Sequence, residues 1–407
     1  MEDIFDRVKL YSEKPKSLSS EEKNRLLIAF ADALIKKSSF ILDANASDVT
    51  AAKKSGLSSA MIDRLSLNEK RIGQMSEGLK SLALLPDPIG ETAEEWTAES
   101  GVLIKKTRIP IGVIGIIYEA RPNVTSDVLG ICLKTGNACV LKGGKEAYST
   151  NLAVLNCFSD VSGEIGKAYA LLPPQRDATD RLIKAKGKID LVIPRGGKGL
   201  INYVKENAAV PFIETGAGVC HLYVEKSADE KKALDILLNA KCSRPSVCNA
   251  VETLLVDRDI AEKFIPKAMK VLAENGVKFH GNAEIGAKFG IEPSDDDVYF
   301  NEYDDLEISL KIVNGAQDAV SHIKKYGTKH SECICTENNA IAEYFMNSLD
   351  SACVYRNAST RFTDGGCFGF GAEIGISTQM LHARGPMGLK EMTTYHYKIY
   401  GDGQVRK

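Results

Sequence analysis

A cysteine and a glycine turn carry the chemistry that this sequence suggests. Cys248 lies in the segment Cys-Ser-Arg-Pro-Ser-Val-Cys-Asn, and Gly196 and Gly197 follow an apolar run at residues 189–194. A thiolate can hold an acyl group covalently, and the backbone N–H groups of a strand-to-helix glycine turn can bind a diphosphate. Together they predict that a nicotinamide cofactor exchanges hydride with an acyl group held on the thiol.

Each of these signals also has a structural explanation. A buried core cysteine would account for Cys248, and Cys242 is a rival nucleophile in the same segment. Arg244 is close enough in sequence to favour a thiolate at Cys248, since a neighbouring cation stabilises that form. The glycine run lacks the Gly-x-Gly-x-x-Gly spacing, so an ordinary tight turn would also explain Gly196 and Gly197.

Polar residues follow two other predicted strands. Lys142 and Lys145 flank a glycine pair, which suits either a phosphate site or a solvated basic turn. Arg121 and Asn123 end the apolar run at 112–118, where α/β sheets bind ligands. Arg121 could hold a carboxylate or phosphate and Asn123 could donate to an oxyanion. Helix capping and a structural ion pair are the alternatives.

A glycine-dense segment at 357–375 contains Ser359, Thr360 and Arg361. Its glycines would let the backbone approach a small anion closely, so we expect these three residues to bind the substrate. A loop-rich junction between domains would explain the same composition.

The elements that must position these residues form an α/β pattern. Residues 1–80 are predicted helical, with an N-terminal cap in the run Ser19-Ser20-Glu21-Glu22, and short apolar runs alternate with helical patterns from residue 112 onward. Continuous apolar strands between helices predict parallel sheets covered on both faces. The predicted strands are 112–118, 138–142, 189–194, 221–224, 250–256 and 308–313, and the helices are 124–134, 151–158, 200–206, 229–240, 260–274 and 316–325.

Two segments have strand patterns without an evident partner in the chain. Residues 92–109 suggest an exposed hairpin, and the tail from 388 alternates aromatic and polar residues. Unpaired strand edges favour an oligomer.

Composition narrows the class of protein. The chain has 407 residues and a net charge of −2, which argues against nucleic acid or an acidic membrane as the main partner. No apolar run is long enough to span a bilayer, and the acidic N-terminus does not resemble a signal peptide. The ten cysteines are scattered without Cys-x-x-Cys spacing, so we expect reduced thiols, no metal site and a cytoplasmic location.

Several long segments resemble the gamma-glutamyl phosphate reductase family of the aldehyde dehydrogenase superfamily: residues 111–125, 189–197, 218–224 and 357–377. The resemblance implies an aldehyde dehydrogenase-like α/β fold, with two Rossmann-like parallel αβα domains and a small oligomerisation sheet. The implied boundaries are 1–91 and 111–219 for an NADP-binding domain, 220–387 for the catalytic domain with the cysteine nucleophile, and 92–110 and 388–407 for the oligomerisation hairpin and tail.

The same resemblance implies roles for individual residues. They are Cys248 as the nucleophile, Lys142 at the adenosine ribose, Gly196 and Gly197 at the cofactor diphosphate, Glu302 at the nicotinamide ribose, and Asn123 or Arg121 at the oxyanion.

Two positions depart from the wider superfamily. Hydrolytic members use a glutamate at the position of Glu214 to activate water, but reduction of an acyl phosphate has no hydrolytic step. We therefore expect Glu214 to be structural or orienting. NAD-preferring relatives often carry a glutamate three residues after the ribose lysine, where this chain has Lys145. A cation suits a 2′-phosphate, so NADPH is the expected cofactor.

The implied activity is reduction of L-glutamate 5-phosphate to the semialdehyde with release of phosphate. The alternatives are an aldehyde dehydrogenase-like enzyme that acts on another acyl donor or an aldehyde, and a catalytically inactive scaffold. A glutamate 5-kinase that makes the acyl phosphate is an implied partner. A homodimer or higher homo-oligomer is the expected assembly.

Overall fold

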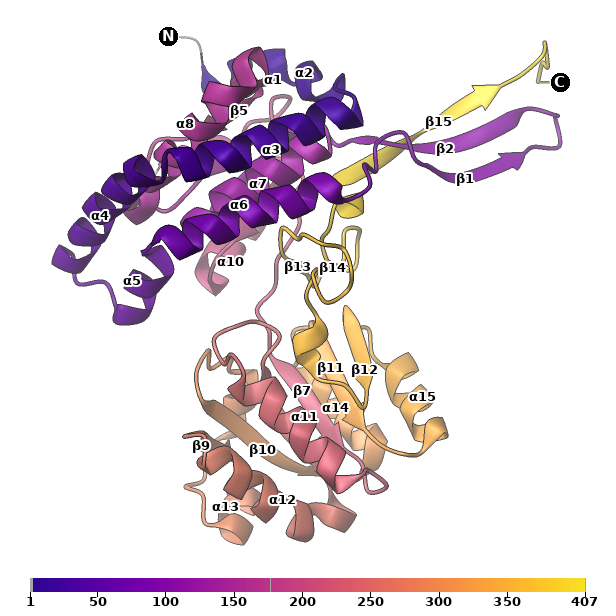
Figure 1. The fold of residues 1–407 in the computed structure, drawn as a ribbon. Coiled ribbons are helices and arrows are strands. Elements are labelled where there is room, and N and C mark those ends of the chain that lie inside the picture. The colour runs from indigo at the N-terminus through magenta and orange to yellow at the C-terminus, as the bar shows by residue number, and fades with distance from the viewer. Residues whose placement is uncertain (1–2, 176, 407) are drawn as a thin grey trace. The chain divides into compact units, whose positions relative to one another are not determined.

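The computed structural model describes residues 3–175 and 177–406, and the chain forms two compact units (Figure 1). The first unit comprises Met1–Glu214, Gly369–Gly375 and Met387–Lys407, and the second comprises Thr215–Phe368 and Ile376–Pro386.

These divisions differ from the expected boundaries at residues 219 and 387. The second unit begins at Thr215, and the short segment Gly369–Gly375, expected in the catalytic domain, belongs to the first unit. Backbone pairing explains the segment's place, because the N–H of Ile374 donates to the carbonyl of Met387 at 2.9 Å. Leu85 also packs over Gly371.

Helices form the N-terminal part of the first unit, as predicted. Ser19 caps α3 through a reciprocal capping box: its hydroxyl accepts from the N–H of Glu22, whose carboxylate accepts from the N–H of Ser19. A buried ion pair between Lys23 and Asp87 ties α3 to the segment that follows α6. The helices are α1 (Ile4–Tyr11), α2 (Glu13–Lys16), α3 (Ser20–Lys36), α4 (Ser38–Lys54), α5 (Ser59–Leu65) and α6 (Glu69–Leu84).

A four-stranded parallel sheet lies at the centre of the first unit, with the order β5-β4-β3-β6. Its strands are almost entirely buried, which explains their continuous apolar sequences. The strands are β3 (Val113–Tyr118), β4 (Ala138–Lys142), β5 (Tyr169–Leu171) and β6 (Leu191–Arg195), and the helices around them are α7 (Pro122–Lys134), α8 (Tyr148–Ser162), α9 (Asp177–Ile183) and α10 (Lys198–Asn207).

The second unit contains a six-stranded parallel sheet with the order β12-β11-β7-β8-β10-β9. Alternate side chains of its strands join two separate cores. Leu222 and Leu254 pack with α11 and α12, while Tyr223 and Leu255 pack with α14 and α15. The sheet is therefore covered on both faces, as a buried parallel sheet requires.

The elements of the second unit are β7 (Cys220–Val224), α11 (Glu230–Cys242), β8 (Val251–Asp257), α12 (Arg258–Ala273), β9 (Lys278–Gly281), α13 (Ala283–Phe289), β10 (Glu307–Val313), α14 (Gly315–Tyr326), β11 (Ser331–Cys335), α15 (Asn339–Ser348), β12 (Cys353–Arg356), and a two-stranded hairpin of β13 (Ile376–Ser377) and β14 (Gly385–Pro386). The prediction of parallel α/β sheets is confirmed.

The expectation that the hairpin and the tail lack a partner inside the chain is wrong. β1 (Thr92–Thr97), β2 (Leu103–Pro110) and β15 (Thr393–Tyr400) form one antiparallel sheet with β2 in the middle (Figure 1). Pairing of segments so far apart in sequence leaves no local signal. β15 therefore completes a sheet of its own chain.

One face of this sheet carries exposed apolar side chains. Trp96 and Ile399 flank Ile104 of the central strand, and Tyr397 contacts Trp96 edge-to-face. Lys106 lies 4.3 Å above the ring of Tyr395. No helix in the described ranges 3–175 and 177–406 is long and apolar enough to cross a membrane.

We predict that removal of residues 395–407 lowers the melting temperature of the protein. The deletion takes most of β15 from the edge of β2, and each lost backbone hydrogen bond contributes about 0.5–1.5 kcal/mol. Removal of residues 401–407 alone is the matched control, because those residues follow β15. Thermal unfolding followed by circular dichroism measures the difference, and equal melting temperatures for the two truncations would contradict the prediction.

Candidate active site

The first unit presents its candidate residues at the carboxyl ends of parallel strands. β4 follows β3 in the chain and pairs on one side of it, whereas β6 pairs on the other side. This reversal of strand order makes the end of β3 and the end of β6 a topological switch point, where open α/β sheets bind ligands. The predicted groups at 119–123, 142–145 and 196–197 lie at the carboxyl ends of β3, β4 and β6.

The glycine turn after β6 leads directly into α10. Gly197 is the N-cap residue of that helix, and its N–H donates to the carboxylate of Glu119 at 3.2 Å. A Cβ at Gly196 would lie 2.8 Å from both Glu119 and Leu200, whereas a Cβ at Gly197 would meet nothing within 4 Å. A side chain at 196 would therefore displace the ends of the Glu119 and Leu200 side chains, while the approach to Gly197 is open. In the structure, Glu119 supplies the anion at this helix N-terminus.

Lys142 is the last residue of β4 and is only 9% exposed. Its Nζ donates to the carbonyl of Gly143 at 2.9 Å. Burial lowers the pKa of Lys142, and the nearby carboxylate of Glu146 partly opposes that shift. Lys145 is exposed at the start of a short 3-10 turn. Sequence reasoning did not single out Glu146, whose closeness to Lys142 depends on this turn.

Asn123 and Arg121 both lie where β3 passes into α7. The amide of Asn123 donates to the carboxylate of Asp127, one turn later in the helix, at 3.2 Å. Burial raises the pKa of Asp127 to about 6, and the hydrogen bond from Asn123 works against that rise. Arg121 is the N-cap residue of α7 and its side chain is exposed.

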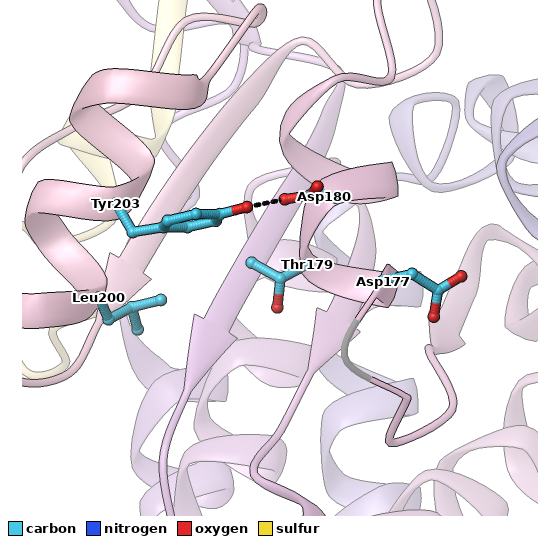
Figure 2. Close-up of a pocket in the computed structure, with 5 residues that line it drawn as sticks. All are labelled: Asp177, Thr179, Asp180, Leu200 and Tyr203. Atoms are coloured by element: carbon cyan, nitrogen blue, oxygen red, sulfur yellow. Dashed lines mark hydrogen bonds between the residues drawn. The ribbon is translucent and has the colours of Figure 1, made fainter.

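A pocket of about 480 Å³ lies between α9 and α10 of the first unit. Figure 2 shows its lining: Asp177, Thr179 and Asp180 come from α9, and Leu200 and Tyr203 come from α10. The Tyr203 hydroxyl donates to the carboxylate of Asp180 and so links the two helices. Because Leu200 and Tyr203 belong to α10, the helix that Gly197 caps, the pocket is next to the glycine turn.

The second unit presents Cys248 at the amino edge of its parallel sheet, in the loop that precedes β8. Gly218, which precedes β7, packs so tightly there that a Cβ on it would lie 1.5 Å from the carbonyl oxygen of Cys248. The thiol of Cys220 donates to the same carbonyl at 3.2 Å. The main chain of Cys248 is thus held by the start of the neighbouring strand, and its side chain is half-buried.

Charge near Cys248 comes from arginines rather than from a helix dipole. The loop follows the C-terminus of α11, where a helix dipole disfavours an anion. Arg244 and Arg361 lie close enough to interact electrostatically with each other, and Arg361 also interacts with Cys248. Cations of this kind stabilise a thiolate.

Cys242 is the last residue of α11, and its surroundings do not favour a thiolate. Burial raises the pKa of its thiol, with only partial opposition from Lys241. The pKa of the Cys220 thiol is raised well above its ordinary value, also by burial. These features make Cys248 the better candidate nucleophile of the segment.

Glu302 and Glu214 have different partners. The carboxylate of Glu302, in the loop before β10, accepts from the N–H of Gly218 at 2.7 Å. Glu302 is therefore next to the residue that packs on Cys248. Glu214, in the first unit, forms an ion pair with Lys205 of α10 at 3.5 Å.

The predicted substrate residues pack against the residue that follows Cys248. Thr360 Oγ1 donates to the carbonyl of Asn249 at 2.6 Å, and the Arg361 guanidinium donates to the Asn249 side chain. Ser359 caps the short turn by accepting from the N–H of Arg361 at 3.3 Å. Asn249 was missed in the sequence, where only its position beside Cys248 could have indicated it.

The second unit thus gathers Cys248, Glu302 and Arg361 in loops that share the amino edge of its sheet. The first unit gathers Asn123, Lys142 and the glycine turn at a carboxyl edge. Within residues 3–175 and 177–406, no group of three or more histidine, cysteine, aspartate or glutamate side chains is placed to hold a metal ion.

Comparisons with known proteins identify relatives of this chain. The profile described as "Aldehyde dehydrogenase family" matches residues 11–289. The gamma-glutamyl phosphate reductase of Caldanaerobacter subterraneus subsp. tengcongensis is 50% identical over 407 residues, which cover 98% of each chain.

Solved structures show the same similarity. The crystal structure of gamma-glutamyl phosphate reductase from Thermotoga maritima is 42% identical, with a TM-score of 0.97 over 100% of this chain and 99% of that one. The glyceraldehyde-3-phosphate dehydrogenase of Methanocaldococcus jannaschii, solved in complex with NADP, shares the fold at 18% identity, with a TM-score of 0.70 over 98% and 94% of the two chains.

A cysteine loop, a glycine turn at a switch point and full-length similarity at about half identity lead to one assignment: the chain belongs to the aldehyde dehydrogenase family, and within it to the gamma-glutamyl phosphate reductases.

Proposed function

We propose that this chain catalyses the NADPH-dependent reduction of L-glutamate 5-phosphate to L-glutamate 5-semialdehyde in proline biosynthesis, with release of phosphate. The observation that carries the proposal is the loop of the second unit, in which Cys248 is held by Gly218 and Cys220 beside the Arg361 guanidinium. Family membership supplies the substrate class.

Cys248 acts as the nucleophile in this proposal. Its thiolate attacks the acyl carbon, the bond from that carbon to the phosphate oxygen breaks, and phosphate leaves with the bonding electrons. A thioester to Cys248 remains. When bound, the cofactor would supply a hydride to the thioester carbon. Breaking of the carbon–sulfur bond then forms the aldehyde and returns the thiolate. Asn123 is the proposed donor to the oxyanion, with Arg121 at the same strand end as the alternative.

Reduction of the thioester needs no activated water. Glu214 has an ion-pair partner in Lys205, which agrees with a structural or orienting role rather than with that of a general base. We therefore propose that Glu214 orients the end of the first unit.

The first unit has features that fit a dinucleotide. The diphosphate would replace the Glu119 carboxylate at the N–H of Gly197, because the N-terminus of a helix favours an anion. The pocket between α9 and α10 would take the adenine, with Leu200 as an apolar wall, and Lys142 would contact the adenosine ribose. Lys145 would pair with a 2′-phosphate, and Glu302 of the second unit would hold the nicotinamide ribose.

Assembly and cellular context complete the proposal. The three-stranded sheet has open outer edges at β1 and β15 and an exposed face that includes Trp96 and Ile399, and such a surface favours a homodimer or a higher homo-oligomer. A truncated chain lacking 395–407 that kept the full assembly mass in light scattering would contradict this.

All ten cysteines are free thiols, which suits the reducing cytoplasm. A glutamate 5-kinase in that compartment would supply the acyl phosphate.

The reverse reaction separates this function from the alternatives. With L-glutamate 5-semialdehyde and NADP⁺, we predict formation of NADPH that requires inorganic phosphate, because phosphate must attack the thioester to release the product. Absorbance at the NADPH band measures the rate. An aldehyde dehydrogenase-like enzyme acting on another acyl donor would not need phosphate, and an inactive scaffold would produce no NADPH. Either result would refute the proposal.

Cys248→Ala is predicted to abolish reduction while the fold is retained, because the substitution removes the acyl acceptor and changes little volume. Cys242→Ala is the matched control and should keep most of the activity, since burial already disfavours its thiolate. Steady-state rates and circular dichroism spectra of the two variants test the assignment, and it is wrong if their activities are reversed.

Lys145→Glu is predicted to shift preference from NADPH towards NADH. The charge reversal would cost about 1–3 kcal/mol of NADPH binding, the usual worth of a charge-assisted hydrogen bond. The ribose hydroxyls of NADH would gain an acceptor. The measurement is the ratio of kcat/KM for the two cofactors, with Lys70→Glu, at an exposed position of α6, as a charge-matched control. An unchanged ratio in Lys145→Glu would rule out this role.

A further inference from the structure

Arg361 is held in place by the side chains of two residues that flank the nucleophile in sequence. Its Nε donates to the Ser243 hydroxyl at 3.2 Å, and one terminal nitrogen donates to the Asn249 amide oxygen. Asn249 is 5% exposed, and its own amide nitrogen donates to the carbonyl of Thr363 at 2.8 Å. The guanidinium is thus fixed by a buried side chain that is itself fixed by the backbone of the Arg361 turn.

The side-chain acceptors that the structure describes for Arg361 are both neutral. An amide oxygen and a hydroxyl orient the guanidinium without cancelling its charge, whereas a carboxylate in the place of Asn249 would cancel much of it. Burial and the nearby Arg244 lower the pKa of Arg361, with partial opposition from the carboxylate of Asp364, but an arginine stays protonated in proteins. A partly buried cation of this kind attracts an anionic ligand.

The location of this cation relative to Cys248 is fixed by the chain. Asn249 is bonded directly to Cys248, and the Asn249 carbonyl accepts from the buried hydroxyl of Thr360. The residue before Arg361 therefore clamps the peptide next to the nucleophile. An anion bound by Arg361 must lie close to the Cys248 thiol.

L-Glutamate 5-phosphate has two anionic groups at different distances from the reacting carbon. The phosphoryl group is attached to that carbon through one oxygen, while the α-carboxylate lies at the far end of the carbon chain. Cys248 must reach the carbon that carries the phosphoryl group. A cation beside Cys248 therefore matches the phosphoryl group rather than the α-carboxylate. The fork of a guanidinium also suits two phosphate oxygens at once.

We propose that Arg361, positioned by Asn249 and Ser243, binds the phosphoryl group of the substrate and the phosphate that leaves. The inference rests on the proposed function, since it requires the acyl phosphate reaction at Cys248. Asn249 and Ser243 are positioning residues that act through Arg361. A guanidinium held by neutral hydrogen-bond acceptors stabilises the charge that accumulates on phosphate as the carbon–oxygen bond breaks.

The test uses the reverse reaction of the full-length chain, with inorganic phosphate as the probe and L-glutamate 5-semialdehyde and NADP⁺ as the other substrates. Asn249→Ala should raise the KM for phosphate by about 10- to 100-fold, the usual worth of orienting a charged hydrogen-bond donor, with little change in the KM for the semialdehyde. Asn249→Asp should also raise the KM for phosphate, because it keeps the acceptor but compensates the charge of Arg361.

Two further variants keep the test decisive. Ser243 is exposed, so Ser243→Ala leaves the core intact and should still raise the KM for phosphate, by a smaller factor. Asn347→Ala is the matched control on the exposed side of α15 and should leave both KM values unchanged.

The outcomes separate this inference from the proposed function. A rise confined to the KM for the semialdehyde would assign Arg361 to the α-carboxylate and overturn the inference. Unchanged KM values for phosphate in both Asn249→Ala and Ser243→Ala would overturn it as well. A wild-type chain that reduces NADP⁺ without phosphate would instead overturn the proposed function.

Discussion

The contact between Gly218 and the carbonyl oxygen of Cys248 is the constraint on which the candidate site depends. A side chain at position 218 would overlap that oxygen, so the start of β7 and the loop before β8 approach more closely than any residue other than glycine allows. Glu302 accepts from the N–H of Gly218, and the Cys220 thiol donates to the Cys248 carbonyl. The nucleophile is therefore held through its main chain.

The two units use opposite edges of their parallel sheets, and this difference decides where positive charge comes from. At the carboxyl edge of the first unit, the helix that begins at Gly197 offers its N-terminus to an anion. At the amino edge of the second unit, Cys248 follows the C-terminus of α11, where the helix dipole has the wrong sign. Side-chain cations, Arg244 and Arg361, take its place, and the neutral acceptors Asn249 and Ser243 orient Arg361.

Sequence patterns predicted those parts of the fold that depend on local chemistry. The buried strands β3, β4, β7 and β8 appear as continuous apolar runs, and the Ser19 cap follows from its neighbours. Pairing of β15 with β2 escaped prediction, because residues nearly 300 positions apart carry no shared local signal. The contacts of Gly218 with Cys248 and of Asn249 with Arg361 escaped it for the same reason. Short elements such as β5, α9, β9 and β12 were missed because they contain too few residues to show a period.

The central claim is that Cys248 carries the acyl group between the two halves of the reaction. Intact-protein and peptide mass spectrometry test it directly, after the chain is mixed with L-glutamate 5-semialdehyde and NADP⁺ without phosphate. The account predicts a glutamyl thioester on the peptide that contains Cys248, and its loss when inorganic phosphate is added. An adduct on another cysteine, or turnover without any adduct on Cys248 in the absence of phosphate, would contradict the account.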